Sequence, residues 1–126
     1  MNKRENARKN VSGLMLIAAL GLIGLMLPQA AAAAPVDTFC TPDQVVVFTN
    51  APRLHVHCTA AVGGVSYFAI STADQAQAAR VLTVINTALV AGRTLVIRYD
   101  PADLSGAPIG CQTNDCRLIQ AVGFGR

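Results

Sequence analysis

The four cysteines of this 126-residue chain, Cys40, Cys58, Cys111 and Cys116, constrain its fold more than any other feature. An even number of cysteines in a short exported domain is typical of a disulfide framework, which stabilises a small core. Four cysteines allow three pairings, and the sequence does not choose among them. We favour Cys40–Cys58 with Cys111–Cys116 because the second pair closes a short loop by itself. The spacing does not suit a four-cysteine zinc site.

The N-terminal segment has the composition of an export signal. Its first ten residues carry four basic side chains and one acidic one, an almost wholly apolar stretch covers 11–27, and a run of alanines follows. This order predicts a secretory signal peptide over 1–33, cleaved after Ala32 or Ala33, and one compact secreted or periplasmic domain over 34–126. An uncleaved membrane anchor is the alternative, because the apolar stretch nearly reaches the roughly 20 residues that span a bilayer.

The charge of the chain depends on that segment. The formal net charge of +3 comes wholly from 1–33, and the rest of the chain balances six arginines against six aspartates. A neutral domain lacks the clustered positive charge that nucleic acids require, and it has no polybasic patch for anionic membranes. We therefore expect no nucleic-acid partner, and no membrane association once the signal is removed.

Alternating and helical patterns predict the elements of the domain. The segment 53–59 alternates strictly between apolar and polar residues, as a half-buried strand requires. Thr72 and Gln75 have the spacing of a capping box, Asp74 suits a helix N-terminus, and Gly92 suits a C-terminal cap. The pattern predicts a helix that buries Ala78, Leu82, Ile85 and Leu89. The predicted elements are strands over 44–49, 53–59 and 65–71, a helix over 73–91, and strands over 93–99 and 117–124.

Three strands, one helix and two strands is the order of the OB-fold, a small five-stranded barrel whose end a helix covers. The fold class expected is therefore mixed α+β or all-β: an OB-like barrel or sheet held by disulfides. A generic α+β sheet with one covering helix fits the same order.

The segment 65–99, with V-S-Y-F-A-I-S before the helix and A-G-R-T-L-V-I-R-Y after it, resembles the core of the pentameric B subunits of subtilase-cytotoxin and pertussis-like bacterial toxins. The ending G-C-Q-T-N-D-C-R is similar to the C-terminal cysteine loop of those subunits. It also resembles a group of small secreted bacterial proteins, of unassigned activity, that share a G-C-x-x-x-D-C-R ending. The first resemblance implies an OB-fold, glycan binding and assembly into a homo-oligomer. It assigns no sugar-contacting residue to this sequence.

Two groups of residues are candidates for ligand contact. Arg98, Tyr99 and Arg117 lie on or beside predicted strands and could bind a glycan or protein partner, although arginines at a surface are commonly paired with Asp100 or Asp115. His55 and His57 lie two apart on one strand face, as two ligands of zinc or copper do when a third converges.

Catalytic patterns are weak. Residues 34–126 contain no glutamate for paired-acid chemistry, no nucleophile motif surrounds Ser66, Ser71 or Ser105, and no glycine-rich phosphate loop follows a strand. The expected function is therefore an exported, non-catalytic binding module without a cofactor, recognising a glycan or a partner protein. A small-ligand or metal-handling protein that uses His55 and His57 is the alternative, and a hydrolase is a weaker one.

Overall fold

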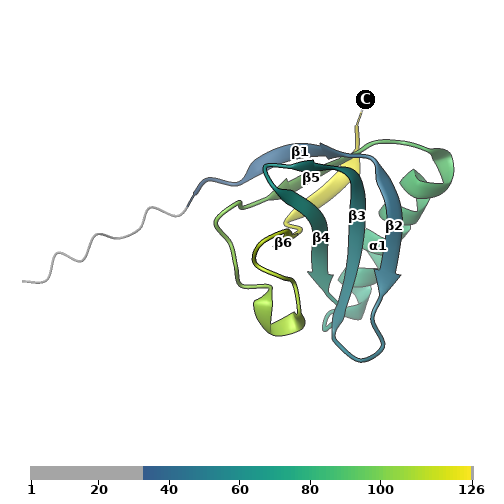
Figure 1. Cartoon of the computed structure of the whole chain (residues 1–126). Coiled ribbons are helices and arrows are strands. Elements are labelled where there is room, and N and C mark those ends of the chain that lie inside the picture. The colour runs from purple at the N-terminus through teal and green to yellow at the C-terminus, as the bar shows by residue number, and fades with distance from the viewer. Residues whose placement is uncertain (1–32, 126) are drawn as a thin grey trace, which may run out of the picture. The chain divides into compact units, whose positions relative to one another are not determined.

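The computed structural model describes residues 33–125 (Figure 1). The predicted signal peptide lies outside these residues, except for Ala33. Within them, no helix is long and apolar enough to cross a membrane. The elements are β1 (Val36–Cys40), β2 (Pro42–Val47), β3 (Arg53–Val62), β4 (Val65–Ser71), α1 (Gln75–Ala91), β5 (Leu95–Tyr99), a 3-10 turn η1 (Ala107–Ile109), β6 (Cys116–Leu118) and β7 (Ala121–Phe124).

The strands form two sheets. One has the order β1-β5-β7 and the other the order β2-β3-β4-β6; neighbouring strands are antiparallel except for the parallel pair β4 and β6. The helix α1 lies against β2 and β7, one strand from each sheet, and in Figure 1 it lies behind β2 and β3. The mixed α+β class is therefore confirmed, while the described strands form two sheets rather than one closed barrel.

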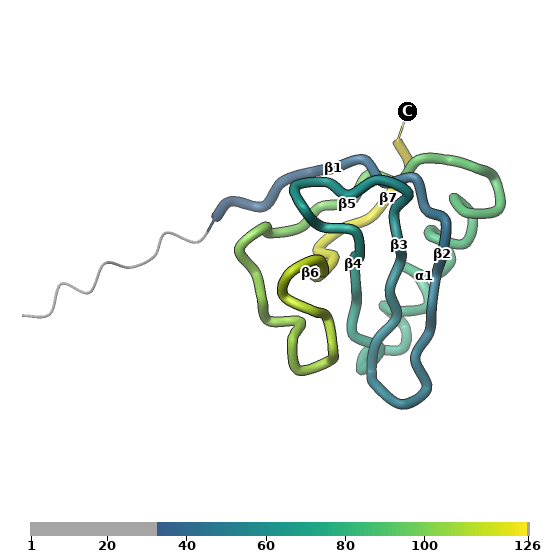
Figure 2. Tube along the Cα trace, in the orientation of Figure 1, coloured from purple at the N-terminus to yellow at the C-terminus, as the bar shows by residue number. Residues whose placement is uncertain are grey.

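The chain passes from one sheet to the other at two corners, which the tube in Figure 2 makes easy to follow. Thr41 alone separates β1 from β2. Ile119 and Gln120 separate β6 from β7, and their backbone N–H groups donate hydrogen bonds to different sheets. That of Ile119 donates to the carbonyl of Ala69 in β4, and that of Gln120 to the carbonyl of Arg98 in β5, each at 2.8 Å. The second corner is therefore hydrogen-bonded to both sheets.

Four of the five predicted strands are present as β2, β3, β4 and β5, with ends shifted by a few residues. The alternation along β3 is confirmed, because Leu54, Val56 and Cys58 are all buried. The strand β1 was not predicted. Its Thr38 is buried at 7% exposure while Phe39 is 68% exposed, so the polar residue points inward and the aromatic one outward. That inverts the pattern by which strands are recognised.

The prediction of one continuous final strand over 117–124 was wrong. The segment forms two short strands with a corner between them, and Ile119 at the corner is buried. The predicted common face of Leu118, Gln120, Val122 and Phe124 does not exist, because Gln120 and Phe124 are exposed. A corner changes which side of the chain faces the core, so period-two alternation does not continue across it.

The helix is shorter at its start than the predicted 73–91. Its N-cap is Asp74, whose carboxylate accepts the backbone N–H of Gln77 at 3.0 Å, so the expected capping role of Thr72 is wrong. At the other end Gly92 has φ +61°, a left-handed conformation that favours glycine. Among the predicted core residues Ala78 and Ile85 are buried, whereas Leu82 and Leu89 are only half-buried.

Both favoured disulfides are confirmed, and they have different positions in the fold. Cys40–Cys58 joins β1 to β3, and therefore one sheet to the other, within the main core. That core also contains Leu54, Val56, Phe68, Ile85, Leu95 and Ile97. Cys111–Cys116 closes the loop that precedes β6 and packs on Ala69 of β4 in a second, smaller cluster. The pairing that the short loop favoured is thus the one that the structure contains.

Candidate functional site

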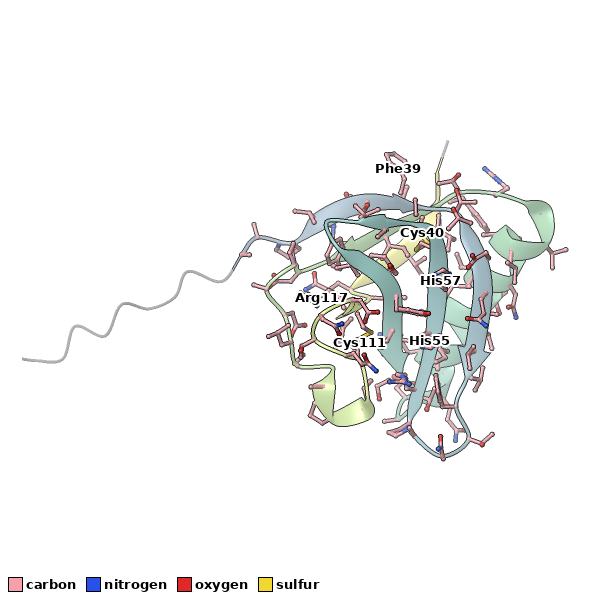
Figure 3. The ribbon with its side chains drawn as sticks, viewed as in Figure 1. Phe39, Cys40, His55, His57, Cys111 and Arg117 are labelled. Atoms are coloured by element: carbon pink, nitrogen blue, oxygen red, sulfur yellow. A yellow bond between two sulfur atoms is a disulfide. The ribbon has the colours of Figure 1, made fainter. Side chains whose placement is uncertain are left out.

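The outer face of the β2-β3-β4 sheet carries the polar residues that the alternation of β3 directs away from the core. Across this sheet His57 pairs with Gln44 on one side and with Tyr67 on the other. His55 lies two residues earlier on the same face. Figure 3 labels both histidines along β3 and Cys111 in the loop beside β4.

Four rings follow one another over this face, and we call them the aromatic row. The ring centroids of Phe48 and His55 are 4.9 Å apart, those of His55 and Tyr67 are 5.0 Å apart, and those of His57 and Tyr67 are 4.7 Å apart. Tyr67 thus contacts both histidines. At one end the guanidinium of Arg53 lies 4.0 Å from the centroid of Phe48, within cation–π range.

The loop that contains Cys111–Cys116 forms a wall beside the aromatic row. The backbone carbonyl of Asp115 accepts the N–H groups of Ser66 and Tyr67, each at 3.0 Å, and so joins the loop to β4. Gly106 lies so close to the disulfide that a Cβ there would be 2.8 Å from Cβ of Cys111. These contacts fix the loop beside β4.

Arg117, a predicted ligand-contacting residue, is part of that wall. Its guanidinium donates to the backbone carbonyls of Pro101, Thr113 and Cys116 at 2.7 to 2.8 Å. Three bonds to carbonyls from three parts of one loop use most of the donors of a guanidinium. Arg117 therefore supports the loop, and it is not paired with an aspartate.

Between the aromatic row and the wall lies a cavity of about 350 Å³. This volume is at the lower end of the range for small-molecule sites. The lining contains amide, guanidinium, imidazole, phenol and carboxylate groups and no aliphatic side chain. The lining residues are Gln44, Arg53, His55, Tyr67, Gly110, Gln112, Asp115 and Cys116.

Arg53 is the cation of this cavity, and its surroundings leave it without a carboxylate partner. Among residues 33–125, Arg98 forms an ion pair with Asp37 and His57 contacts the carboxylate of Asp43, while no carboxylate lies within 4 Å of the Arg53 guanidinium. The Nε atom of Arg53 is buried and has no hydrogen-bond partner among the described residues. The ring of Phe48 lies 4.0 Å from the guanidinium.

His55 is electrostatically coupled to Arg53. Burial, followed in size by the positive charges of Arg53 and of a protonated His57, lowers the pKa of His55. All three effects oppose protonation of the imidazole. At neutral pH His55 therefore lines the cavity as a neutral ring that can donate from one nitrogen and accept at the other.

His57 has a partner of its own. Its Nδ1 donates to Oδ1 of Asp43 at 2.6 Å, which leaves Nε2 as the acceptor in the neutral ring. Within the described residues no group of three or more histidine, cysteine, aspartate or glutamate side chains could hold a metal ion. The structure thus brings His55 and His57 to one face, where they contact Tyr67 rather than converge with a third ligand.

Arg98 and Tyr99 lie elsewhere. Tyr99 is 4% exposed and its ring packs 5.0 Å from that of Phe68 in the core, so it offers no surface to a ligand. Arg98 is exposed and forms two hydrogen bonds to the carboxylate of Asp37, at 2.8 and 2.9 Å; the partner is neither Asp100 nor Asp115. This pair lines a shallower cavity of about 300 Å³ on the β1-β5-β7 sheet. The structure therefore does not bring Arg98, Tyr99 and Arg117 together.

Sequence reasoning missed most of the cavity. Arg53 shares the outward face of β3 with the two histidines, and that signal was present in the alternation. Tyr67 belongs to the predicted strand 65–71, and only the register of β4 against β3 shows that it lies beside His57. Gln112 and Asp115 belong to a loop whose position the sequence does not give.

Comparison with known proteins adds no relative to this picture. No protein-family model matches the chain, and no curated protein matches it.

We expect His55 to titrate below the ordinary histidine value of about 6.5. Because Arg53 repels the protonated ring, Arg53→Gln should raise the pKa of His55 but leave it depressed by burial. Histidine ring signals followed by NMR against pH measure this directly. Since the unfolded chain binds this proton more readily, stability should also fall as the pH drops from about 6.5 through the folded pKa. A pKa that Arg53→Gln leaves unchanged would contradict the coupling.

Proposed function

We propose that this protein is an exported, non-catalytic binding module that recognises a saccharide in the cavity between the aromatic row and the disulfide-closed wall. The observation that carries the proposal is the lining itself. Gln44, Gln112 and Asp115 supply amide and carboxylate groups of the kind that hydrogen-bond to sugar hydroxyls, and the rings of His55 and Tyr67 supply surfaces for a sugar ring. A volume of about 350 Å³ suits one or two sugar units better than a protein surface.

The proposed fold supports the same location. If β1 and β2 are counted as one bent strand, and β6 and β7 as another, the seven strands reduce to five. Two corners, a helix after β4 and the parallel pair of β4 with β6 all favour a partly open OB-like barrel. In such a barrel β3 and β4 are the second and third strands. Their outer face and the neighbouring loops form the binding surface of OB-folds.

The proposal favours binding over catalysis because of what the cavity contains. Its lining offers no hydroxyl of serine or threonine, and its cysteine is oxidised. The Asp43–His57 pair has the arrangement of a general base and its orienting acid, but His57 contacts the ring of Tyr67 rather than a nucleophile. A hydrolase that works through a covalent intermediate would need a side-chain nucleophile beside that histidine.

A glycan array followed by NMR tests the proposal. The domain, labelled with ¹⁵N, should bind members of the array, and the bound saccharide should shift the backbone signals of His55, Tyr67 and Gln112. Gln112→Ala should weaken binding without changing the melting temperature, because this side chain is exposed in the loop. Gln77→Ala, on the exposed side of α1, is the matched control. Shifts confined to the Asp37–Arg98 cavity would refute the proposed site.

We also propose that the chain is exported through cleavage of residues 1–32 or 1–33. The two disulfides support an oxidising compartment. The protein recovered from the periplasm or the medium should begin at Ala33 or Ala34, as intact-mass measurement would show. A mass that retains Met1 would show that the N-terminal segment stays attached.

A further inference from the structure

The geometry points to a ligand that carries a single negative charge on an oxyanion, and to Arg53 as the residue that recognises this group. The inference deepens the proposed function and rests on the same cavity. It concerns a group present in carboxylates, sulfate monoesters and phosphodiesters alike.

The first argument is the state of the Arg53 guanidinium. Its Nε atom is buried without a partner, and no carboxylate of the described residues pairs with it. The exposed Arg98, by contrast, has Asp37, and the half-buried Arg117 has three carbonyls. A cation that is partly removed from water without an anion is costly, and a bound oxyanion would remove that cost. Arg53 lines the cavity in which such an anion would lie.

The second argument is that the guanidinium is held in place. The ring of Phe48 covers one side of it at 4.0 Å. Gly110 approaches so closely that a Cβ there would be 2.6 Å from Nη1, and its φ of +89° also favours glycine. A guanidinium confined between a ring and a backbone turn loses little further freedom on binding, and its planar donors match two oxygens of one anion.

The third argument concerns the amount of charge. His55 is neutral at neutral pH because its pKa is lowered. Asp115 lines the same cavity without forming an ion pair with Arg53, so it contributes one negative charge to the site. One oxyanion charge can be balanced by Arg53, whereas a second would meet Asp115 with no remaining cation among the lining residues. The cavity therefore favours a singly charged group over a dianion.

The decisive experiment titrates the ¹⁵N-labelled domain with acetate and with methyl sulfate at constant ionic strength, while NMR follows the Arg53 Nε–H and the His55 ring. Both anions should shift these signals, and sulfate dianion and a neutral amide should not. Arg53→Gln should weaken anion binding by about tenfold or more, which corresponds to about 1.4 kcal/mol. Arg80→Gln, on the exposed side of α1, should bind as the wild type does.

Two further variants test the planar donors of Arg53 and the negative charge of Asp115 separately. Arg53→Lys retains the charge but not the planar pair of donors, so it should bind acetate more weakly than the wild type and more tightly than Arg53→Gln. Asp115→Asn removes the repelling carboxylate and should tighten acetate binding. Equal shifts with acetate and the neutral amide, or acetate binding that survives Arg53→Gln, would overturn the inference.

A glycan array separates this inference from the proposed function. Preference for carboxylated or sulfated members over their neutral counterparts, lost in Arg53→Gln, would support both. Equal binding of charged and neutral members would overturn the inference and leave the saccharide function. An array without any bound member, together with specific acetate binding at Arg53, would overturn the saccharide function and leave the anion site.

Discussion

Replacing Cys40 and Cys58 together with alanine is expected to lower the free energy of unfolding by about 3 kcal/mol, the chain-entropy value for a loop of this length. The pair closes a separation of 18 residues and joins β1 to β3, so its loss removes a covalent link between the two sheets. It also removes two sulfur atoms from the main core. A domain of this size has a stability near the lower end of the usual 5–15 kcal/mol, so this loss removes about half of it and should lower the melting temperature by about 12–24 °C.

Urea denaturation of the double variant and of the wild type measures this difference. Replacing Cys111 and Cys116 with alanine is the matched comparison, because that pair closes a separation of only 5 residues and lies in the smaller cluster. Its loss should cost less, about 2 kcal/mol in the same treatment, and should loosen the wall of the cavity while the sheets persist. A larger loss from the second pair than from the first would contradict the assignment of the two roles.

Ile85→Ala is expected to lower the free energy of unfolding by about 2–5 kcal/mol. Ile85 is 0% exposed on the face of α1 that closes the main core, so its truncation leaves a cavity that the surrounding strands fill poorly. Leu82→Ala should cost less, because Leu82 is only half-buried, although the sequence pattern treats the two residues alike.

Thermal and urea unfolding of these variants provide the measurement, with Thr87→Ala as the control. Thr87 is exposed, and its hydroxyl donates only to the carbonyl of Thr83 one turn earlier, so its loss should be nearly silent. Equal tolerance at Ile85 and Thr87 would show that α1 does not cover the core as the structure has it.

The hydropathy pattern of the sequence does not predict the strand β1. Thr38 is buried and Phe39 exposed because this strand pairs with β5, which sets the direction of each side chain through the register rather than through hydropathy. The final segment 117–124 failed for a related reason. Its hydropathy suggests one strand, but a corner at Ile119 and Gln120 lets it join both sheets. Neither the partner nor the corner is encoded in local periodicity.

The residues of the candidate site likewise fall into two groups: those whose position follows from the sequence and those whose position only the structure shows. His55 and Arg53 lie on one face because alternation along β3 puts them there, and that much follows from the strand itself. Other lining residues, among them Tyr67, Gln112 and Asp115, come from β4 and from a loop more than 40 residues later in the sequence. Tyr99 is a candidate binding residue from the sequence that the structure removes from the site, because its side chain is packed in the core.

The sequence by itself determined local features of this protein, namely the alternation of β3 and the helix that ends at Gly92, and its short loop favoured, without deciding, the pairing of Cys111 with Cys116. These features depend on residues close together in the chain, where backbone geometry and loop length act directly. Only the tertiary structure decided that β1 pairs with β5, that the last strand turns a corner, and that Arg53 lies against Gly110 beside the cavity. Those contacts join distant segments, and many arrangements of the same local elements are compatible with one sequence pattern until packing selects among them.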